Sequence, residues 1–172
     1  NNNPLEGGQQ LQDVFLFSPI FFQGTLVGFG ATVAHHLDLG GGAPGLNPDA
    51  TDVHQEGIIF PPSKYNMDHD WNGGPLERLV RANIRVPDQT IGDFNAQFAA
   101  NGIGGSRVQD LCQRFTSDVV LEAMDELLDY SERRMRAAIR ELPDGVFYGE
   151  DFLDDDGITD EPLRVQAKVE IK

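Results

Sequence analysis

Residues 13–42 read DVFLFSPIFFQGTLVGFGATVAHHLDLGGG, and this stretch decides the fold of the first part of the chain. Two runs rich in Phe, Val, Leu and Thr, at 14–22 and 25–34, are typical of β-strands. Gln23-Gly24 between them is typical of a two-residue hairpin turn. Both runs are too apolar to alternate cleanly, so we expect strands that are buried on both faces.

Polar residues and glycines follow directly after the second run. His35, His36 and Asp38 precede three consecutive glycines, a pattern that predicts a tight turn beside polar side chains. Asp13 begins the first run, so a hairpin would bring it close to His35. A divalent cation needs about three or four donors from separate elements, and this pair begins either a metal site or an acid/base site. The alternative is that His35 is a hydrogen-bonded core histidine.

Neighbouring residues of a strand point to opposite faces. At most one of His35 and His36 can therefore join Asp13, and we expect the other to pack or to bind substrate. Three further clusters carry weaker signals. Asp151 with Asp154-Asp155-Asp156 lacks the spacing of an EF-hand and favours a solvated turn. The residues around His69 indicate a surface loop. No Walker-type or GxGxxG pattern supports phosphate binding at Gly40-Gly41-Gly42.

The remaining pattern predicts a mixed α+β fold with an N-terminal β-hairpin, a long ordered loop, a helical middle and C-terminal strands. The loop covers 39–75, with one short strand at 57–60, and helical periodicity begins at Pro75. Glycines at 102, 104 and 105 interrupt the helical pattern, Cys112 falls on its apolar face, and the strongest helix covers 116–142. Strands are expected at 146–152 and 163–171, the second alternating and half-buried. We expect one segment, 1–172, with strand and loop residues at 1–74, helices at 75–142 and strands at 143–172.

Composition excludes several classes of function. The chain of 172 residues has a net charge of −15 and a pI near 4.4, which disfavours nucleic acid and anionic membranes as partners. Cys112 is the only cysteine, and neither a signal peptide nor a long apolar span is evident, so a reducing cytoplasm is the expected location. The chain does not begin with Met and its strand patterns reach close to both ends. We therefore expect a segment of a longer polypeptide.

Several ordered strings together resemble one family, the hydantoinase B/oxoprolinase family, which includes B-type subunits of ATP-dependent N-methylhydantoinases, 5-oxoprolinases and acetone or acetophenone carboxylases. The strings are NP at 3–4, GG at 7–8, QLQD at 10–13, AHHLDLGG at 34–41, QEG at 55–57, IFPP at 59–62, NIRVP at 83–87, GD at 92–93, AQ at 96–97, AAN at 99–101, DYSERRMR at 129–136 and DDDG at 154–157. The resemblance covers essentially the whole chain and predicts an interior segment of a much longer subunit.

The resemblance implies metal ligands at Asp13 and His35. Gln10 stands where the family commonly has a histidine, and an amide oxygen is a poorer donor to a transition metal than imidazole. A further acidic ligand of the family lies nearer the N-terminus than this segment reaches. We therefore expect low or absent metal occupancy. Without a full ligand set, His35 or His36 would act as a general base, with Asp38 in the same catalytic group.

The resemblance also implies a division of labour between two subunits. An actin-like A-type partner uses ATP and magnesium to phosphorylate a carbonyl or amide oxygen of a small-molecule substrate, and the B-type subunit completes hydrolysis or carboxylation. The leading hypothesis is an ATP-dependent cyclic-amide hydrolase acting as a hetero-oligomer. Gln10 favours its rival, a ketone carboxylase, because carboxylation does not require activated water. A third hypothesis is a structural or interaction segment without its own catalysis.

Overall fold

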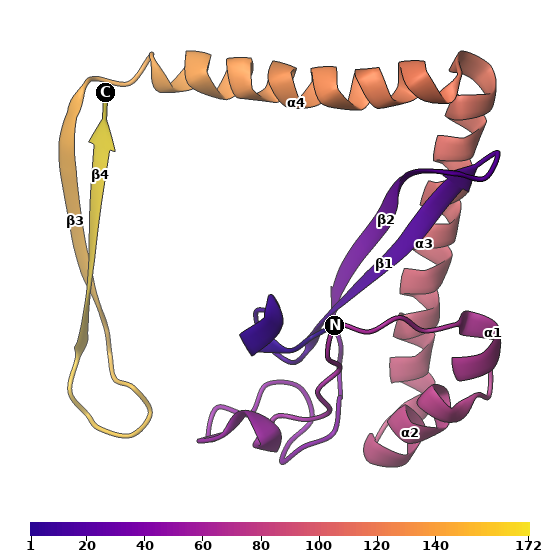
Figure 1. Ribbon diagram of the computed structural model, residues 1–172. Helices are drawn as coiled ribbons and strands as arrows, with labels where there is room; N and C mark the ends of the chain where they lie inside the picture. Colours follow the sequence, from indigo (N-terminus) through magenta and orange to yellow (C-terminus); the bar gives the residue numbers. More distant parts are fainter. The chain divides into compact units, whose positions relative to one another are not determined.

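The computed structural model describes all 172 residues and confirms a mixed α+β fold (Figure 1). It divides into two compact units, Asn1–Ser117 and Asp118–Lys172. The elements in chain order are β1 (Asp13–Phe22), β2 (Thr25–His35), α1 (Met67–Asp70), α2 (Pro75–Asn83), α3 (Pro87–Phe115), α4 (Ser117–Ile139), β3 (Gly145–Leu153) and β4 (Leu163–Ile171), with short 3₁₀ helices at Pro4–Glu6 and Val53–Gln55. None of the helices is both long and apolar enough to cross a membrane.

The predicted N-terminal hairpin is confirmed. Strands β1 and β2 pair antiparallel from Phe22↔Thr25 to Asp13↔His35, with one register shift between Ile20 and Phe21. Gln23 and Gly24 form the turn with φ of 50° and 82°. Positive φ at both central residues is the geometry that matches the twist of a two-residue hairpin.

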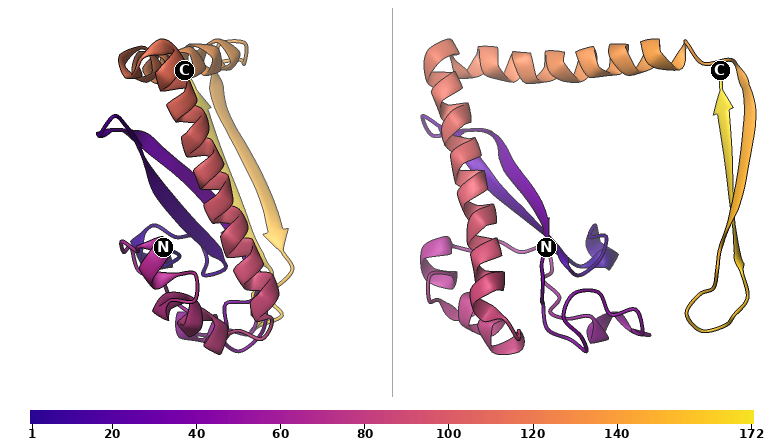
Figure 2. Two further views of the ribbon diagram at one scale, coloured as in Figure 1. Left: turned by 90° about the vertical axis from the view of Figure 1, so that its right-hand side faces the viewer. Right: turned by 180° about the vertical axis from the view of Figure 1, so that it is seen from behind.

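Helix α3 covers only one face of this hairpin, as both views in Figure 2 show. On the α3 side, Val14 and Val27 are each 2% exposed. On the opposite face, Phe17 and Phe29 are 63% and 60% exposed. The prediction that both faces are buried is therefore wrong for this chain, because a second layer does not lie over the face that carries Phe17.

Helix α3 also corrects the expected interruption at Gly102, Gly104 and Gly105. It continues unbroken through these glycines to Phe115. Each glycine weakens a helix by about 1 kcal/mol relative to alanine, but the helix gains contacts along the hairpin that local propensity does not include. The backbones pack closely at Gly30 of β2, where a Cβ would lie 3.2 Å from the carbonyl oxygen of Asn101. Cys112 is buried in this helix, as predicted.

The loop between β2 and α1 contains no strand at 57–60, contrary to the prediction. Isolated hydrogen bonds, and not a strand ladder, hold this loop in place. Ile58 N donates to Leu39 O, and the buried Asn2 side chain accepts from Phe60 N at 2.7 Å and donates to Ile58 O at 2.9 Å. A core of eight buried side chains joins this loop to the hairpin and helices: Val14, Leu39, Phe60, Trp71, Val80, Ile84, Ile91 and Phe94.

The second unit contains α4 and a second antiparallel hairpin. Strands β3 and β4 pair from Gly145↔Ile171 to Leu153↔Leu163, which confirms both predicted strands. The expectation that the strand at 163–171 is half-buried is wrong here, since its residues are exposed up to Glu170. Alternation predicts which side chains share a face, whereas burial requires another layer on that face.

Candidate functional site

Asp13 and His35 form a cross-strand pair at the open end of the β1–β2 hairpin. Phe15 exchanges backbone hydrogen bonds with Asn1 on the outer edge of β1, so the odd-numbered residues at this end of β1 belong to non-hydrogen-bonded pairs, in which side chains lie closest. His35 Nδ1 lies 3.8 Å from Asp13 Oδ1, and the side chains are 44% and 15% exposed. The pair lies on the hairpin face opposite α3, where solvent can reach it.

Gln10 lies beside this pair and turns its amide nitrogen toward the aspartate. Gln10 Nε2 donates to Asp13 Oδ2 at 3.2 Å. It therefore offers Asp13 a hydrogen and not a metal-binding lone pair. No group of three or more His, Cys, Asp and Glu side chains in the chain is arranged to hold a metal ion. Asp13 and His35 can supply two ligands, which is fewer than a divalent cation requires, so the chain's own side chains do not complete a metal site.

His36 lies on the opposite face from His35, as strand alternation predicts, and is completely buried. Its ring stacks on Phe94 of α3 with centroids 4.1 Å apart, and its Nε2 lies 2.9 Å from Gln97 Oε1. Gln97 Nε2 donates to the carbonyl of Val14 at 3.0 Å. This contact fixes the amide orientation, so its oxygen accepts from His36 and His36 carries its hydrogen on Nε2.

Burial lowers the pKa of His36 from its ordinary value, and the hydrogen bond to Gln97 only partly opposes this effect. The ring is therefore held neutral at pH 7. Its Nδ1 has no hydrogen-bond partner among the residues of the chain. His36 accordingly packs behind the Asp13–His35 pair, on the α3 side of the hairpin. A catalytic role for His36 stays a prediction.

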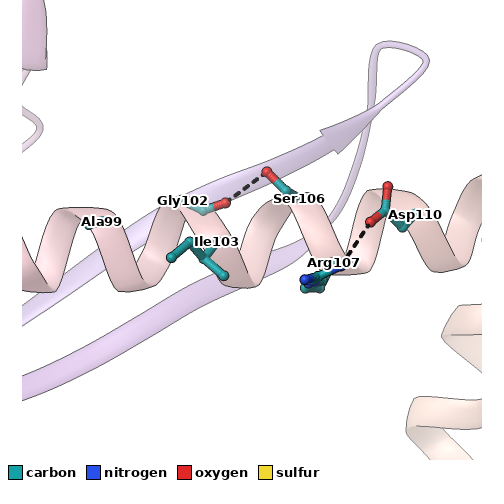
Figure 3. Close-up of a pocket in the computed structure, with 6 residues that line it drawn as sticks. All are labelled: Ala99, Gly102, Ile103, Ser106, Arg107 and Asp110. Atoms are coloured by element: carbon teal, nitrogen blue, oxygen red, sulfur yellow. Dashed lines mark hydrogen bonds and ion pairs between the residues drawn. The ribbon is translucent and has the colours of Figure 1, made fainter.

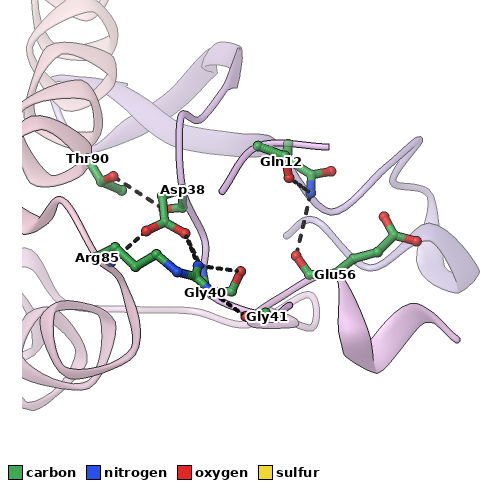
Figure 4. A network of polar contacts seen from close by, with 8 residues as sticks. Gln12, Asp38, Gly40, Gly41, Glu56, Arg85 and Thr90 are labelled. Atoms are coloured by element: carbon green, nitrogen blue, oxygen red, sulfur yellow. Dashed lines mark hydrogen bonds and ion pairs between the residues drawn. The ribbon is translucent and has the colours of Figure 1, made fainter. Parts of the chain in front are cut away.

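Asp38 is also fully buried and anchors the loop that follows β2 (Figure 4). Its carboxylate accepts from the backbone N–H groups of Arg85 at 2.5 Å and of Gly40 at 2.9 Å. The Arg85 guanidinium lies 3.1 Å from the same carboxylate and also donates to the carbonyl of Gly41 at 2.6 Å. Thr90, in the first turn of α3, donates to the carbonyl of Asp38 at 3.2 Å. These contacts tie the loop to the segment between α2 and α3, and a catalytic role for Asp38 stays a prediction.

The glycines after Asp38 serve close backbone packing. Gly40 and Gly41 have φ of 88° and 74°, the left-handed region that disfavours other residues. A Cβ on Gly41 would collide with the carbonyl oxygen of Gln55. Two amides of this run are already used internally, because Gly40 N donates to Asp38 and Gly42 N donates to Gln55 O. They do not point into a free cradle for phosphate.

The weaker candidates lie elsewhere on the surface. The carboxylate of Asp156 accepts from the backbone N–H groups of Thr159 and Ile158, which lower its pKa, and this makes a solvated acidic turn as expected. His69 lies exposed in α1. A shallow depression along α3 runs past Gly102, Ser106, Arg107 and Asp110 and is lined by residues of this helix alone (Figure 3). Neither the hairpin nor the loop after β2 contributes a residue to it.

Three residues that hold the strands and the loop around the Asp13–His35 pair in place were not identified from the sequence. Gln97 is 5% exposed, Thr90 is fully buried, and Arg85 bonds a buried carboxylate. A signal was available for Gln97, because it is a polar residue beside the apolar stripe of Phe94 and Phe98. Buried polar side chains in such a stripe require hydrogen-bond partners. The partners themselves could not be named from the sequence.

Comparison with known proteins identifies the family of the chain. The family model described as Hydantoinase B/oxoprolinase matches residues 1–172. The chain belongs to the hydantoinase B/oxoprolinase family. This confirms the resemblance drawn from the motifs between positions 3 and 157.

Among individual proteins, the chain is similar to the caprolactamase subunit beta of Pseudomonas jessenii, with 34% identity over 177 residues, which cover 100% of this chain and 30% of that subunit. It also matches the crystal structure of the ATP-dependent caprolactamase from Pseudomonas jessenii, with a TM-score of 0.85, 34% identity and 99% of this chain covered against 30% of that one. The acetophenone carboxylase delta subunit of Aromatoleum aromaticum is 26% identical over 158 residues, which cover 91% of this chain and 23% of that subunit. The chain thus spans about 30% of the length of the first curated relatives it matches.

Proposed function

We propose that this chain is part of the B-type catalytic subunit of an ATP-dependent cyclic-amide hydrolase, and that Asp13 and His35 are its reacting pair. The observation that carries the proposal is their placement, side by side and accessible, at the end of a hairpin whose other face is fixed by α3. Membership of the family and the match to an ATP-dependent caprolactamase support a cyclic amide as the substrate class.

The proposed reaction begins on an A-type partner subunit, where ATP and magnesium phosphorylate the amide oxygen. In the B-type site, His35 accepts a proton from water as the water oxygen bonds to the activated carbon. As the C–N bond breaks, His35 returns this proton to the ring nitrogen, and the proton left on the added hydroxyl is released to solvent while the carbonyl forms. The product is an acyl phosphate, which a second water hydrolyses to the carboxylate and inorganic phosphate. Asp13 stabilises the imidazolium form of His35, as a carboxylate beside a catalytic histidine does.

The complex is proposed to be a hetero-oligomer located in the cytoplasm. The name of the caprolactamase subunit beta supports a partner subunit for that relative, and we extend it to this chain. A divalent cation at Asp13 and His35 would need donors beyond those of this chain, so no step of the proposed reaction passes through a metal.

Ketone carboxylation is the second candidate function. Two observations favour it, the similarity to the acetophenone carboxylase delta subunit and the neutral amide of Gln10 beside Asp13. A carboxylase joins carbon dioxide to its phosphorylated substrate and has no need of a base that activates water. The chemistry of the product therefore separates the two candidates.

The test assays the purified complex with ATP against hydantoin, 5-oxoproline and caprolactam, and separately against acetophenone with bicarbonate. We expect ring-opened products in the first set. Carboxylate formation from the ketone alone would overturn the hydrolase proposal and support the second candidate.

A second test asks whether Asp13 and His35 take part in the reaction. The variants Asp13→Ala and His35→Ala should each lower turnover about 100- to 10,000-fold, whereas His54→Ala, at an exposed histidine of the loop, should leave it unchanged. Partner ATPase activity in the presence of substrate shows that the complex has assembled. Unchanged turnover in assembled Asp13→Ala and His35→Ala complexes would support a structural segment without its own catalysis.

A further inference from the structure

A single side chain of α3 connects the residues that adjoin both members of the Asp13–His35 pair. Gln97 Nε2 donates to the carbonyl of Val14, which follows Asp13 in β1, at 3.0 Å. Gln97 Oε1 accepts from the ring of His36, which follows His35, at 2.9 Å. The amide thus bridges the two strands from the face opposite the reacting side chains.

This bridge lies at the open end of the hairpin, which is not closed by a turn. The turn at Gln23-Gly24 closes the far end, whereas Asp13 is the first residue of β1 and His35 is the last residue of β2. Beyond them, one backbone bond from His36 N to Gln12 O continues the pairing. The ends of a two-stranded ribbon open easily, and any opening here would change the 3.8 Å distance between Asp13 Oδ1 and His35 Nδ1.

We propose that Gln97 is a positioning residue that fixes the spacing of Asp13 and His35 by bridging Val14 and His36. The inference rests on the proposed function, since it assigns the pair a role in the reaction. Gln97 itself is buried at 5% exposure and does not face the reacting side chains. It acts through the two strands, and its effect belongs to the rate of the chemical step and not to substrate binding.

The same helix contains a matched control. Asn101, one helical turn further on, is 3% exposed. Its side-chain amide donates to Leu16 O and Ser18 Oγ, each at 3.3 Å. Asn101 therefore joins α3 to the same strand with the same chemical group, but its side-chain hydrogen bonds go to β1 alone and it lies away from the reacting pair. If α3 only stabilises the hairpin, the two amides are equivalent.

The experiment uses the assembled complex and measures kcat and KM for a cyclic amide. Gln97→Met keeps the volume and removes the hydrogen bonds of the amide to Val14, His36 and Thr32. We expect it to lower kcat about 10- to 100-fold, the effect of a misplacement of about 1 Å in a reacting group, with KM unchanged. Asn101→Leu should lower thermal stability to a similar extent and leave kcat near that of the unmodified enzyme. Equal kcat values in the two variants would overturn the proposal.

Two further variants decide the remaining outcomes. Gln97→Asn keeps a polar amide in the buried position but is too short to reach both partners, so it should fold and still lose kcat. Gln97→Met should have no additional effect in a His35→Ala background, because residues that act through one another are not additive. A wild-type kcat in Gln97→Asn, an additive effect in the His35→Ala background, or failure of both Gln97 variants to assemble while Asn101→Leu assembles would each overturn the positioning role.

The proposed function fails in a different way. If Asp13→Ala and His35→Ala retain full turnover, the pair has no role in the reaction whatever Gln97 does. If those variants lose turnover while Gln97→Met matches Asn101→Leu, only the positioning role fails.

Discussion

The chain contains two antiparallel hairpins of similar length that differ in what lies behind them. One face of β1–β2 packs on α3, whose buried Gln97 and Asn101 side chains hydrogen-bond to β1. In β3–β4 the residues are exposed on both faces, and the charged contacts are surface pairs such as Arg164 with Glu150. The two hairpins thus have similar local structure, but only β1–β2 has a helix packed on one face.

This difference shows what the end of a strand requires to hold reacting side chains in fixed positions. The open end of β1–β2 carries Asp13 and His35, and Asp144 and Lys172 adjoin the open end of β3–β4. Only the N-terminal hairpin has buried polar side chains that fix the backbone beneath its polar end. Reacting groups need supporting residues whose own positions are fixed by packing and hydrogen bonds. In this chain α3 and Arg85 provide that support, through His36 and Asp38.

The largest predicted contrast concerns two phenylalanines. Phe94 is 3% exposed and contacts the rings of His36 and Trp71, so Phe94→Ala should cost about 3–5 kcal/mol of stability. Phe147 in β3 is 45% exposed, and Phe147→Ala should cost about 1 kcal/mol or less. Hydrogen exchange of α3 and β3 amides in the intact protein measures both. Equal losses would show that the β3–β4 face is covered in the assembled protein and would break the comparison.

Two carboxylates give the next contrast. Asp38→Ala leaves the N–H groups of Arg85 and Gly40 and the Arg85 guanidinium without their acceptor, and should destabilise the N-terminal unit by about 3 kcal/mol. Glu150→Ala removes an exposed pair with Arg164 and should cost about 0–1 kcal/mol. Chemical denaturation followed by hydrogen exchange reports each unit separately. A loss from Glu150→Ala as large as that from Asp38→Ala would contradict the assignment of the second hairpin as unsupported.

Two glycines with nearly the same φ allow the cost of steric crowding to be measured separately from the cost of the backbone conformation. Gly41 and Gly157 have φ of 74° and 76°. Alanine at either position pays about 1–2 kcal/mol for the left-handed conformation. Only Gly41→Ala also drives a Cβ into Gln55 O, whereas the space around Gly157 is open. Thermal unfolding should therefore show a loss from Gly41→Ala about 1–2 kcal/mol greater than from Gly157→Ala, and identical losses would show that the loop after β2 adjusts freely.

The smallest predicted effect is a pH dependence. The hydrogen bond from Arg81, and then that from the Gly73 backbone, lower the pKa of Glu77 below 4.5. The folded state therefore favours the charged form, and this stability is complete above pH 4.5 and lost as pH falls through the lowered pKa. Glu77→Gln should flatten the decline in stability below pH 4.5. Asp156→Asn, in the solvated turn, should change it less because solvent screens that carboxylate, and a larger effect there would reverse the comparison.

Much of the local structure could be predicted, because it depends on neighbours in sequence. The turn at Gln23-Gly24, all four strands and the separation of His35 from His36 follow from residue type and period two. The errors arose where the presence or absence of contacts with distant segments decided the outcome. Residues 57–60 bond to Leu39 and Asn2 as isolated partners and not as a ladder, and α3 continues through its glycines because it packs along the hairpin.

The sequence by itself determined the family, the α+β class and the cross-strand relation of Asp13 to His35, because motif order and strand register are properties of the chain. The tertiary structure alone decided what each polar residue does. It buried His36 on Phe94, joined Asp38 to Arg85 across 47 residues of chain, and placed Gln97 between Val14 and His36. Those roles depend on which donors meet which acceptors in three dimensions, and no local pattern in the sequence records such pairings.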